Sequence, residues 1–169
     1  MLRVRELAEL ARRLDAATFA AQMGPFALMQ RPGGDGRADK ARLVTVGLPS
    51  NVLEKAPPPV EFEELMVATL PPPAPDGTME LVIGRSPDSD LVVEDPSVSS
   101  RHAAIRWDGE TAVIVDLGSV NGTYLNGKKL ESYAPLTNGD QLGFGRAHFI
   151  FLPATELYAR IRRSIHLAG

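Results

Sequence analysis

Residues 116–127, Asp-Leu-Gly-Ser-Val-Asn-Gly-Thr-Tyr-Leu-Asn-Gly, contain two Asn-Gly pairs, and a third pair follows at Asn138. Asn and Gly tolerate the positive φ that tight hairpin turns require. Three such pairs between short apolar runs therefore predict antiparallel strands that are joined by tight turns.

The same pattern of short apolar runs and turn residues extends on both sides of this stretch. From position 62 onward, short apolar runs are separated by turn residues at intervals of about 8 to 12 residues, which is typical of an all-β sandwich or barrel. Residues 112–117 are largely apolar on both faces, as expected of a central strand. The predicted strands are residues 62–69, 79–84, 91–93, 103–107, 112–117, 123–125, 141–144 and 148–152.

The two ends of the chain follow other patterns. Apolar residues at three- and four-residue steps predict an amphipathic helix over the first 22 residues, which the Gly-Pro pair at position 24 ends. Residues 26–29 and 43–48 are predicted strands, and residues 56–59, Ala-Pro-Pro-Pro, are a predicted spacer. The expected domains are an N-terminal extension over residues 1–59, a β-sandwich over residues 60–152 and a short C-terminal helix over residues 153–169.

The composition excludes several classes of protein. The 169 residues include no cysteine, so a disulfide framework, a thiolate nucleophile and a Cys-ligated zinc site are excluded. No run of about 18 apolar residues exists, and the charged N-terminus lacks the apolar core of a signal peptide. We therefore expect a soluble, cytoplasmic protein with no membrane span.

The net charge of −3 is distributed unevenly. Residues 1–59 contain 9 Lys and Arg against 6 Asp and Glu, residues 60–152 contain 6 against 14, and residues 153–169 contain 3 against 1. Nucleic-acid binders usually gather Lys and Arg on their folded domain. The acidic middle region therefore argues against DNA or RNA as a partner.

The sequence lacks the motifs of common enzymatic chemistry. It has three histidines, none of them in an i, i+4 pair, and no GxxxxGKS/T, GxGxxG or GxSxG motif. The acidic pairs at 88 and 90 and at 94 and 95 match no known coordination loop and are expected to cap turns. No catalytic residue, metal or cofactor is therefore predicted.

Three loop segments have residues that suit an anion: Gly-Arg at 84–85, Ser-Ser-Arg-His at 99–102 and Gly-Ser-Val-Asn-Gly-Thr at 118–123. Arginine presents N–H donors that match phosphate oxygens, serine and asparagine add short-range donors, and glycines let backbone N–H groups approach. Loops also collect these residues because they form turns. From spacing alone, both interpretations stay open.

These segments, taken in order, resemble the forkhead-associated (FHA) family. The resemblance rests on Leu-Val-Ile-Gly-Arg at 81–85, Val-Ser-Ser-Arg-His-Ala at 98–103, the stretch at 116–127 and Leu-Thr-Asn-Gly-Asp at 136–140. It implies a β-sandwich of about eleven strands in two layers, whose apical loops bind a phosphothreonine-containing peptide without catalysis.

The resemblance also implies site residues at the matching positions. Arg85 and Ser99 match the residues that contact the phosphate. Ser100 matches a polar or basic residue near the phosphate or the peptide backbone, and Asn121 matches the asparagine that holds the peptide main chain. Three further positions match structural supports of the site: Gly84, His102 and Gly122.

Val120, a further residue of the expected peptide-binding set, departs from the family pattern, which commonly has threonine there. A hydrogen bond to a charged group contributes about 1.5 to 3 kcal/mol, so the missing hydroxyl predicts weaker phosphate binding unless a backbone N–H or a water substitutes.

Two functions from different classes stay open. The first is a non-catalytic, phosphothreonine-peptide-binding adaptor in Ser/Thr kinase signalling, whose partner is a Ser/Thr kinase, its substrate or another phosphothreonine-containing protein. The second is a phosphate-independent scaffold for oligomerisation or protein docking. Val120 and the acidic middle region motivate the scaffold, because an acidic domain repels a dianionic ligand at long range. Flanks rich in Ala, Arg and Pro indicate a bacterial source.

Overall fold

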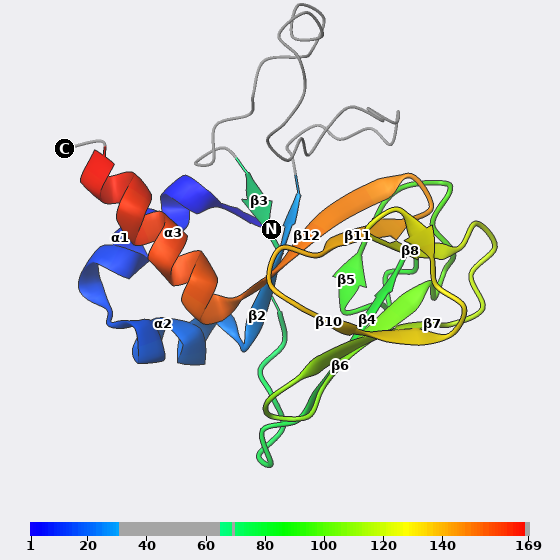
Figure 1. The fold of residues 1–169 in the computed structure, drawn as a ribbon, viewed down its shortest axis with the longest axis horizontal. Helices are drawn as coiled ribbons and strands as arrows, with labels where there is room; N and C mark the ends of the chain where they lie inside the picture. The colour runs from blue at the N-terminus through cyan, green and yellow to red at the C-terminus, as the bar shows by residue number, and fades with distance from the viewer. Residues whose placement is uncertain (31–64, 69, 168–169) are drawn as a thin grey trace, which may run out of the picture.

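The computed structural model describes residues 1–30, 65–68 and 70–167. A sandwich of two sheets lies at one end of the molecule and three helices lie at the other (Figure 1). The seven-stranded sheet has the order β1 (Leu2–Arg3), β3 (Met66–Val67), β2 (Phe26–Gln30), β12 (Ala147–Pro153), β11 (Gln141–Phe144), β8 (Thr123–Leu125) and β9 (Lys128–Lys129). The five-stranded sheet has the order β10 (Tyr133–Leu136), β7 (Ala112–Asp116), β6 (Ala103–Trp107), β4 (Met79–Gly84) and β5 (Leu91–Val92).

The core between the two sheets is formed by the side chains that point inward from both sheets. In β4, Leu81 and Ile83 are fully buried, whereas Glu80 faces solvent, because successive side chains of a strand point to opposite faces. Ile105 of β6 and Phe144 of β11 are also fully buried in this core. The predicted β-sandwich with two sheets is confirmed, with a helical N-terminal region and a C-terminal helix beside it.

A second apolar cluster joins the helices to the sandwich. Along β2, Phe26 and Leu28 point into the core between the sheets, and Ala27 and Met29 point into the cluster under the helices. Both faces of β2 are buried, which explains its uninterrupted apolar sequence. β2 is hydrogen-bonded to β12, so residues 26–30 are part of the same sheet as the C-terminal half of the chain.

The helices differ in part from the prediction. The single helix predicted over the first 22 residues is wrong, because the structure has two helices, α1 (Val4–Arg13) and α2 (Ala16–Met23). Asp15 accepts a hydrogen bond from the Thr18 N–H at 3.0 Å and caps α2. Both helices bury apolar residues in the same cluster, so the periodicity continues across the break. The C-terminal helix is confirmed as α3 (Ala154–Leu167).

The strands predicted within residues 79–152, and the strand at 26–29, are confirmed with shifts of one residue at some ends. Three short strands are not predicted: β1, β9 and β10. Each lies at the edge of a sheet, where a strand needs little apolar surface and tolerates a proline such as Pro135. The predicted strand at 43–48 and the spacer at 56–59 lie outside the described residues, and the domain boundaries stay a prediction.

Candidate functional site

Four segments that are distant in the sequence meet at one end of the sandwich. The Arg85 N–H, after β4, donates to the Ser99 carbonyl at 2.9 Å. The Val120 N–H, between β7 and β8, donates to the Ser99 hydroxyl oxygen at 3.0 Å. The Gly145 N–H, between β11 and β12, donates to the Gly122 carbonyl at 3.3 Å. The predicted site residues are therefore brought together by hydrogen bonds between loops.

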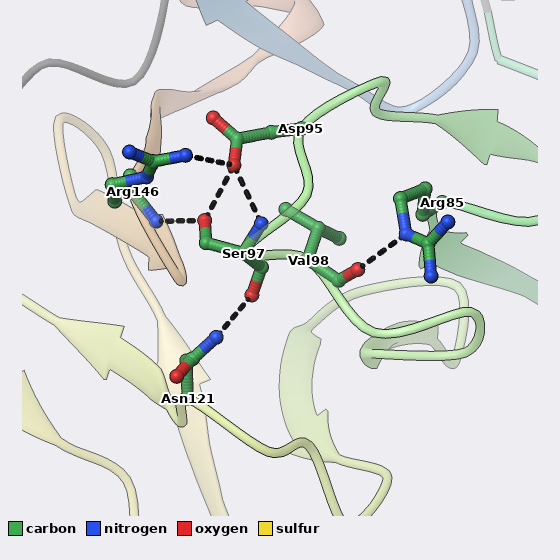
Figure 2. A network of polar contacts seen from close by, with 6 residues as sticks. All are labelled: Arg85, Asp95, Ser97, Val98, Asn121 and Arg146. Carbon is green, nitrogen blue, oxygen red and sulfur yellow. Dashed lines mark hydrogen bonds and ion pairs between the residues drawn. The ribbon is translucent and has the colours of Figure 1, made fainter.

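Arg85 presents an oriented cation at this end of the sandwich. Its Nε donates to the Val98 carbonyl at 3.1 Å, as Figure 2 shows. The side chain is exposed, and its two Nη groups have no hydrogen-bond partner in the described part of the chain. One bond thus holds the guanidinium in place while the outer N–H donors remain free for an anion.

Ser99 has a hydroxyl proton that is available to a ligand. Its oxygen accepts the Val120 N–H, and its backbone N–H donates to Nδ1 of His102 at 3.1 Å. The hydroxyl proton has no acceptor among the residues that the structure describes. Since a serine hydroxyl can donate one hydrogen bond while accepting others, Ser99 can add a donor beside Arg85.

His102 ties two of these loops together from inside. It is fully buried, and its Nε2 lies 3.0 Å from the Gly122 carbonyl. Because Nδ1 accepts the Ser99 N–H, Nε2 must bear the proton and donate to Gly122. Burial lowers the pKa of His102, which favours this neutral form.

This arrangement predicts a loss of stability on mild acidification. The folded-state pKa of His102 is lowered, so the unfolded chain binds the proton more readily, and stability falls as pH drops through the ordinary histidine pKa. We expect the free energy of unfolding to fall by about 1 kcal/mol between roughly pH 7.5 and 5.5. Urea unfolding across this range measures the loss, with His148→Gln as a control that should keep it. A His102 ring that titrates at or above its ordinary pKa by NMR would contradict the assignment.

The glycines of the site are required by close approach and by backbone geometry. A Cβ added to Gly84 would lie 2.1 Å from the Ser100 carbonyl oxygen, far inside van der Waals contact. Gly122 has a φ of +85°, which favours glycine. The structural support of the site that the sequence predicts for both glycines stays a prediction.

Asn121 and Ser100 are both exposed at this end. Asn121 donates through Nδ2 to the Ser97 carbonyl at 2.8 Å, which leaves its Oδ1 without a partner among the described residues. The Ser100 carbonyl accepts from the Ser86 N–H and from the Ser89 hydroxyl. The Ser100 side chain makes no hydrogen bond within the described ranges. Val120 exposes 86% of its surface, so its side chain faces solvent at the rim.

Two carboxylates that the sequence did not assign to the site hold its loops. Asp116 accepts hydrogen bonds from the Ser119 and Thr123 hydroxyls, both at 2.6 Å. Burial by itself raises the pKa of Asp116, but these bonds and two backbone N–H groups outweigh it and lower the pKa. Asp95 accepts from the Ser97 N–H and hydroxyl at 2.7 and 2.6 Å, which confirms the predicted turn cap. The Asp-x-x-Ser spacing at 116–119, which is typical of a turn held by an aspartate side chain, could have identified Asp116 from the sequence.

Arg146 completes a network beside Asn121. Its backbone N–H donates to the Ser97 hydroxyl oxygen at 2.8 Å, and its Nη2 lies 3.4 Å from Oδ1 of Asp95 (Figure 2). No sequence pattern links residues 95–97 to position 146, so only the structure shows this contact.

A hollow of about 680 Å³ lies on the five-stranded sheet, where Arg106, Val113 and Tyr133 line it, and extends to Asp116 and Gly118. None of the predicted site residues lines it. A ligand that lies across loop tips needs donors on the surface rather than a deep cavity, so we place the candidate site at the loops.

Two other features are absent from residues 1–30, 65–68 and 70–167. No helix there is long and apolar enough to cross a membrane. No three His, Asp or Glu side chains there gather in a way that could hold a metal ion.

Sequence comparison relates part of the chain to two proteins whose names describe a regulator and an inhibitor. It is 46% identical over 69 residues to the glycogen accumulation regulator GarA of Mycolicibacterium smegmatis, covering 41% of this chain and 43% of that protein. It is 45% identical over 73 residues to the oxoglutarate dehydrogenase inhibitor of Corynebacterium jeikeium, covering 43% and 50%. The match thus spans half or less of each relative, and both relatives are bacterial, as the flanks of this chain indicate.

Structural comparison supports the fold. The FHA domain of the CT664 protein from Chlamydia trachomatis superposes with a TM-score of 0.52 and 21% identity, covering 76% of this chain and 97% of that one. The family model of the FHA domain matches residues 81–145, which contain the loops from Arg85 to Gly145. Residues 81–145 therefore form an FHA domain within this chain.

Proposed function

We propose that the chain is a non-catalytic adaptor that binds phosphothreonine-containing peptides in Ser/Thr kinase signalling. In this proposal Arg85, Ser99, Ser100, Val120 and Asn121 form the peptide-binding surface. The proposal is carried by the Arg85 Nη groups and the Ser99 hydroxyl, which donate to no described residue and lie on loops that hydrogen bonds join.

The chemistry of these donors suits a phosphate. A phosphothreonine carries a charge of about −1.5 to −2 near pH 7 and three acceptor oxygens. The Arg85 guanidinium offers paired N–H donors, and Ser99 adds a neutral donor. Asn121 is held by Ser97, so its free Oδ1 is positioned to accept a hydrogen bond from a peptide N–H. Gly84, His102 and Gly122 support these loops from below in the same proposal.

The relatives support a non-catalytic partner-binding function. Their names describe a regulator and an inhibitor. By analogy we propose that this chain acts in the cytoplasm and that its partner is a Ser/Thr kinase, a substrate of such a kinase, or another phosphothreonine-containing protein, without nucleic acid.

The deciding experiment is binding of the full chain to a degenerate phosphothreonine peptide library, beside unphosphorylated and phosphoserine versions. We expect capture of the phosphothreonine peptides and little capture of unphosphorylated ones. Equal capture of phosphorylated and unphosphorylated peptides would overturn the proposal and favour the phosphate-independent scaffold.

Val120 allows a test in the direction of tighter binding. Its N–H is already bonded to Ser99, so it does not replace the missing threonine hydroxyl. We expect Val120→Thr to raise the affinity for a phosphothreonine peptide about three- to tenfold, because a hydroxyl at this rim can donate to the phosphate. Titration calorimetry measures the change, and Val120→Ala, which adds no donor, should leave the affinity within about twofold. An unchanged affinity in Val120→Thr would place this side chain away from the phosphate.

A further inference from the structure

We propose that Lys129 and Arg146 select phosphothreonine segments that bear a second negative group close to the phosphothreonine. This proposal rests on the proposed function and names the class of partner segment. The second group is either a carboxylate side chain or another phosphate on the same segment.

The first observation is the distribution of positive charge over residues 60–152. This region has only six Lys and Arg against 14 Asp and Glu. Five of the six belong to segments that meet at the site: Arg85, Arg101, Lys128, Lys129 and Arg146. Arg106, in contrast, is paired with Glu80 at 2.7 Å on the five-stranded sheet. An acidic domain that gathers most of its few cations around one site favours anionic ligands there.

The second observation is the position of Lys129. A Cβ added to Gly122 would lie 2.8 Å from Cε of Lys129, so the lysine stem runs alongside the Asn121–Gly122 backbone. The side chain is exposed and forms no ion pair with any described residue. Its ammonium group is therefore a free charge at the edge of the proposed peptide-binding surface.

The third observation is the position of Arg146, on the same side of the site. The turn that contains it is bonded to Gly122 through the Gly145 N–H, and the Arg146 N–H is bonded to the Ser97 hydroxyl oxygen. Asn121 is bonded to the Ser97 carbonyl. Lys129 thus lies beside Gly122 itself. Arg146 follows Gly145, which is bonded to Gly122, and is bonded to Ser97, which also holds Asn121.

The Arg146 charge is only partly used within the protein. Its contact with Asp95 is long, at 3.4 Å, and its side chain is 52% exposed. Asp95 is already bonded twice by Ser97 at shorter distances. Nε and Nη1 of Arg146 have no partner in the described part of the chain. These donors remain available to a carboxylate or phosphate.

The arrangement separates two positive regions. In Figure 2, Arg85 lies beyond Val98, whereas Arg146 and Asn121 lie at Ser97. A peptide whose phosphate contacts Arg85 and whose main chain contacts Asn121 passes toward Lys129 and Arg146. A second negative group on such a segment meets positive charge there, and a neutral segment does not.

The test compares three peptides with one phosphothreonine core: neutral flanks, aspartate flanks, and a second phosphoserine in place of the aspartates. For the full-length wild-type chain at low salt, we expect the aspartate and doubly phosphorylated peptides to bind about five- to tenfold tighter than the neutral one. The Lys129→Gln, Arg146→Gln double variant should bind all three peptides within about twofold of each other. Arg106→Gln is the matched control and should keep the preference.

The outcomes separate this inference from the proposed function. Binding of all three peptides with equal affinity by the wild type, or a preference that persists in the double variant, overturns the inference and leaves phosphothreonine binding intact. Failure of all three peptides to bind the wild type overturns both. A preference for only one of the two charged peptides, lost in the double variant, supports the inference and identifies the second group as carboxylate or phosphate.

Discussion

Replacing Arg85 with alanine is expected to weaken the binding of a phosphothreonine peptide by at least about 100-fold. The two Nη groups of the guanidinium bond to none of the described residues, and each charge-assisted hydrogen bond to a ligand contributes about 1.5 to 3 kcal/mol. Loss of two such bonds corresponds to a change of about 100-fold or more in the dissociation constant. The side chain is exposed and makes one bond to Val98, so we expect the melting temperature to fall by no more than about 3 °C.

Arg106→Ala is the matched control for this experiment. Arg106 is also an exposed arginine of the domain, but it is paired with Glu80 away from the loops. Its replacement should change the affinity by less than about twofold, because a surface ion pair outside the site contributes little. Calorimetric titration of both variants with the same peptide measures the difference. If Arg85→Ala bound as tightly as the wild type, phosphate recognition by this site would be excluded.

Replacing Gly84 with alanine is expected to be the most destabilising change at the site. The added Cβ would lie 2.1 Å from the Ser100 carbonyl oxygen and 2.8 Å from the Ser89 hydroxyl oxygen. The nearer atom belongs to the backbone, which must move to relieve the clash. That movement strains the loop which bears Ser99, since the Arg85 N–H is bonded to Ser99 and the Ser86 N–H to Ser100. We expect a loss of about 2 to 4 kcal/mol in the free energy of unfolding.

Urea unfolding of Gly84→Ala measures this loss, and Gly77→Ala provides the control. Gly77 has a φ of +82° and no atom within 4 Å of an added Cβ. Its replacement should cost about 1 kcal/mol through backbone conformation alone. Gly84 has no positive φ, so a loss in Gly84→Ala that exceeds the loss in Gly77→Ala is due to the steric contact at Ser100. Equal stability of Gly84→Ala and the wild type would show that the fold does not depend on the close approach of Gly84 to the Ser100 carbonyl.

The β-sandwich could be predicted from the sequence because its signals are local. Short apolar runs identify strands such as β4 and β6, and the Asn-Gly pair at 126–127 marks the tight turn between the antiparallel strands β8 and β9. The prediction is wrong for the other two Asn-Gly pairs, which lie in connections that pass from one sheet to the other. The short edge strands β9 and β10 escaped prediction because a strand at an edge has little apolar surface to show. The break between α1 and α2 was not predicted, because both helices bury apolar residues in one cluster and the apolar spacing therefore continues past the break.

The sequence by itself determined the family resemblance and the identity of the candidate ligand-facing residues, because these are carried by residue types in a fixed order along the chain. Only the tertiary structure decided how those residues can act. The Ser99 hydroxyl oxygen is held by the Val120 N–H, and the neutral form of His102 depends on burial, which lowers its pKa. The cations beside Asn121 come from strands and turns that are adjacent only in the folded sheet. Contacts between residues so far apart along the chain follow from sheet packing, which no local pattern encodes.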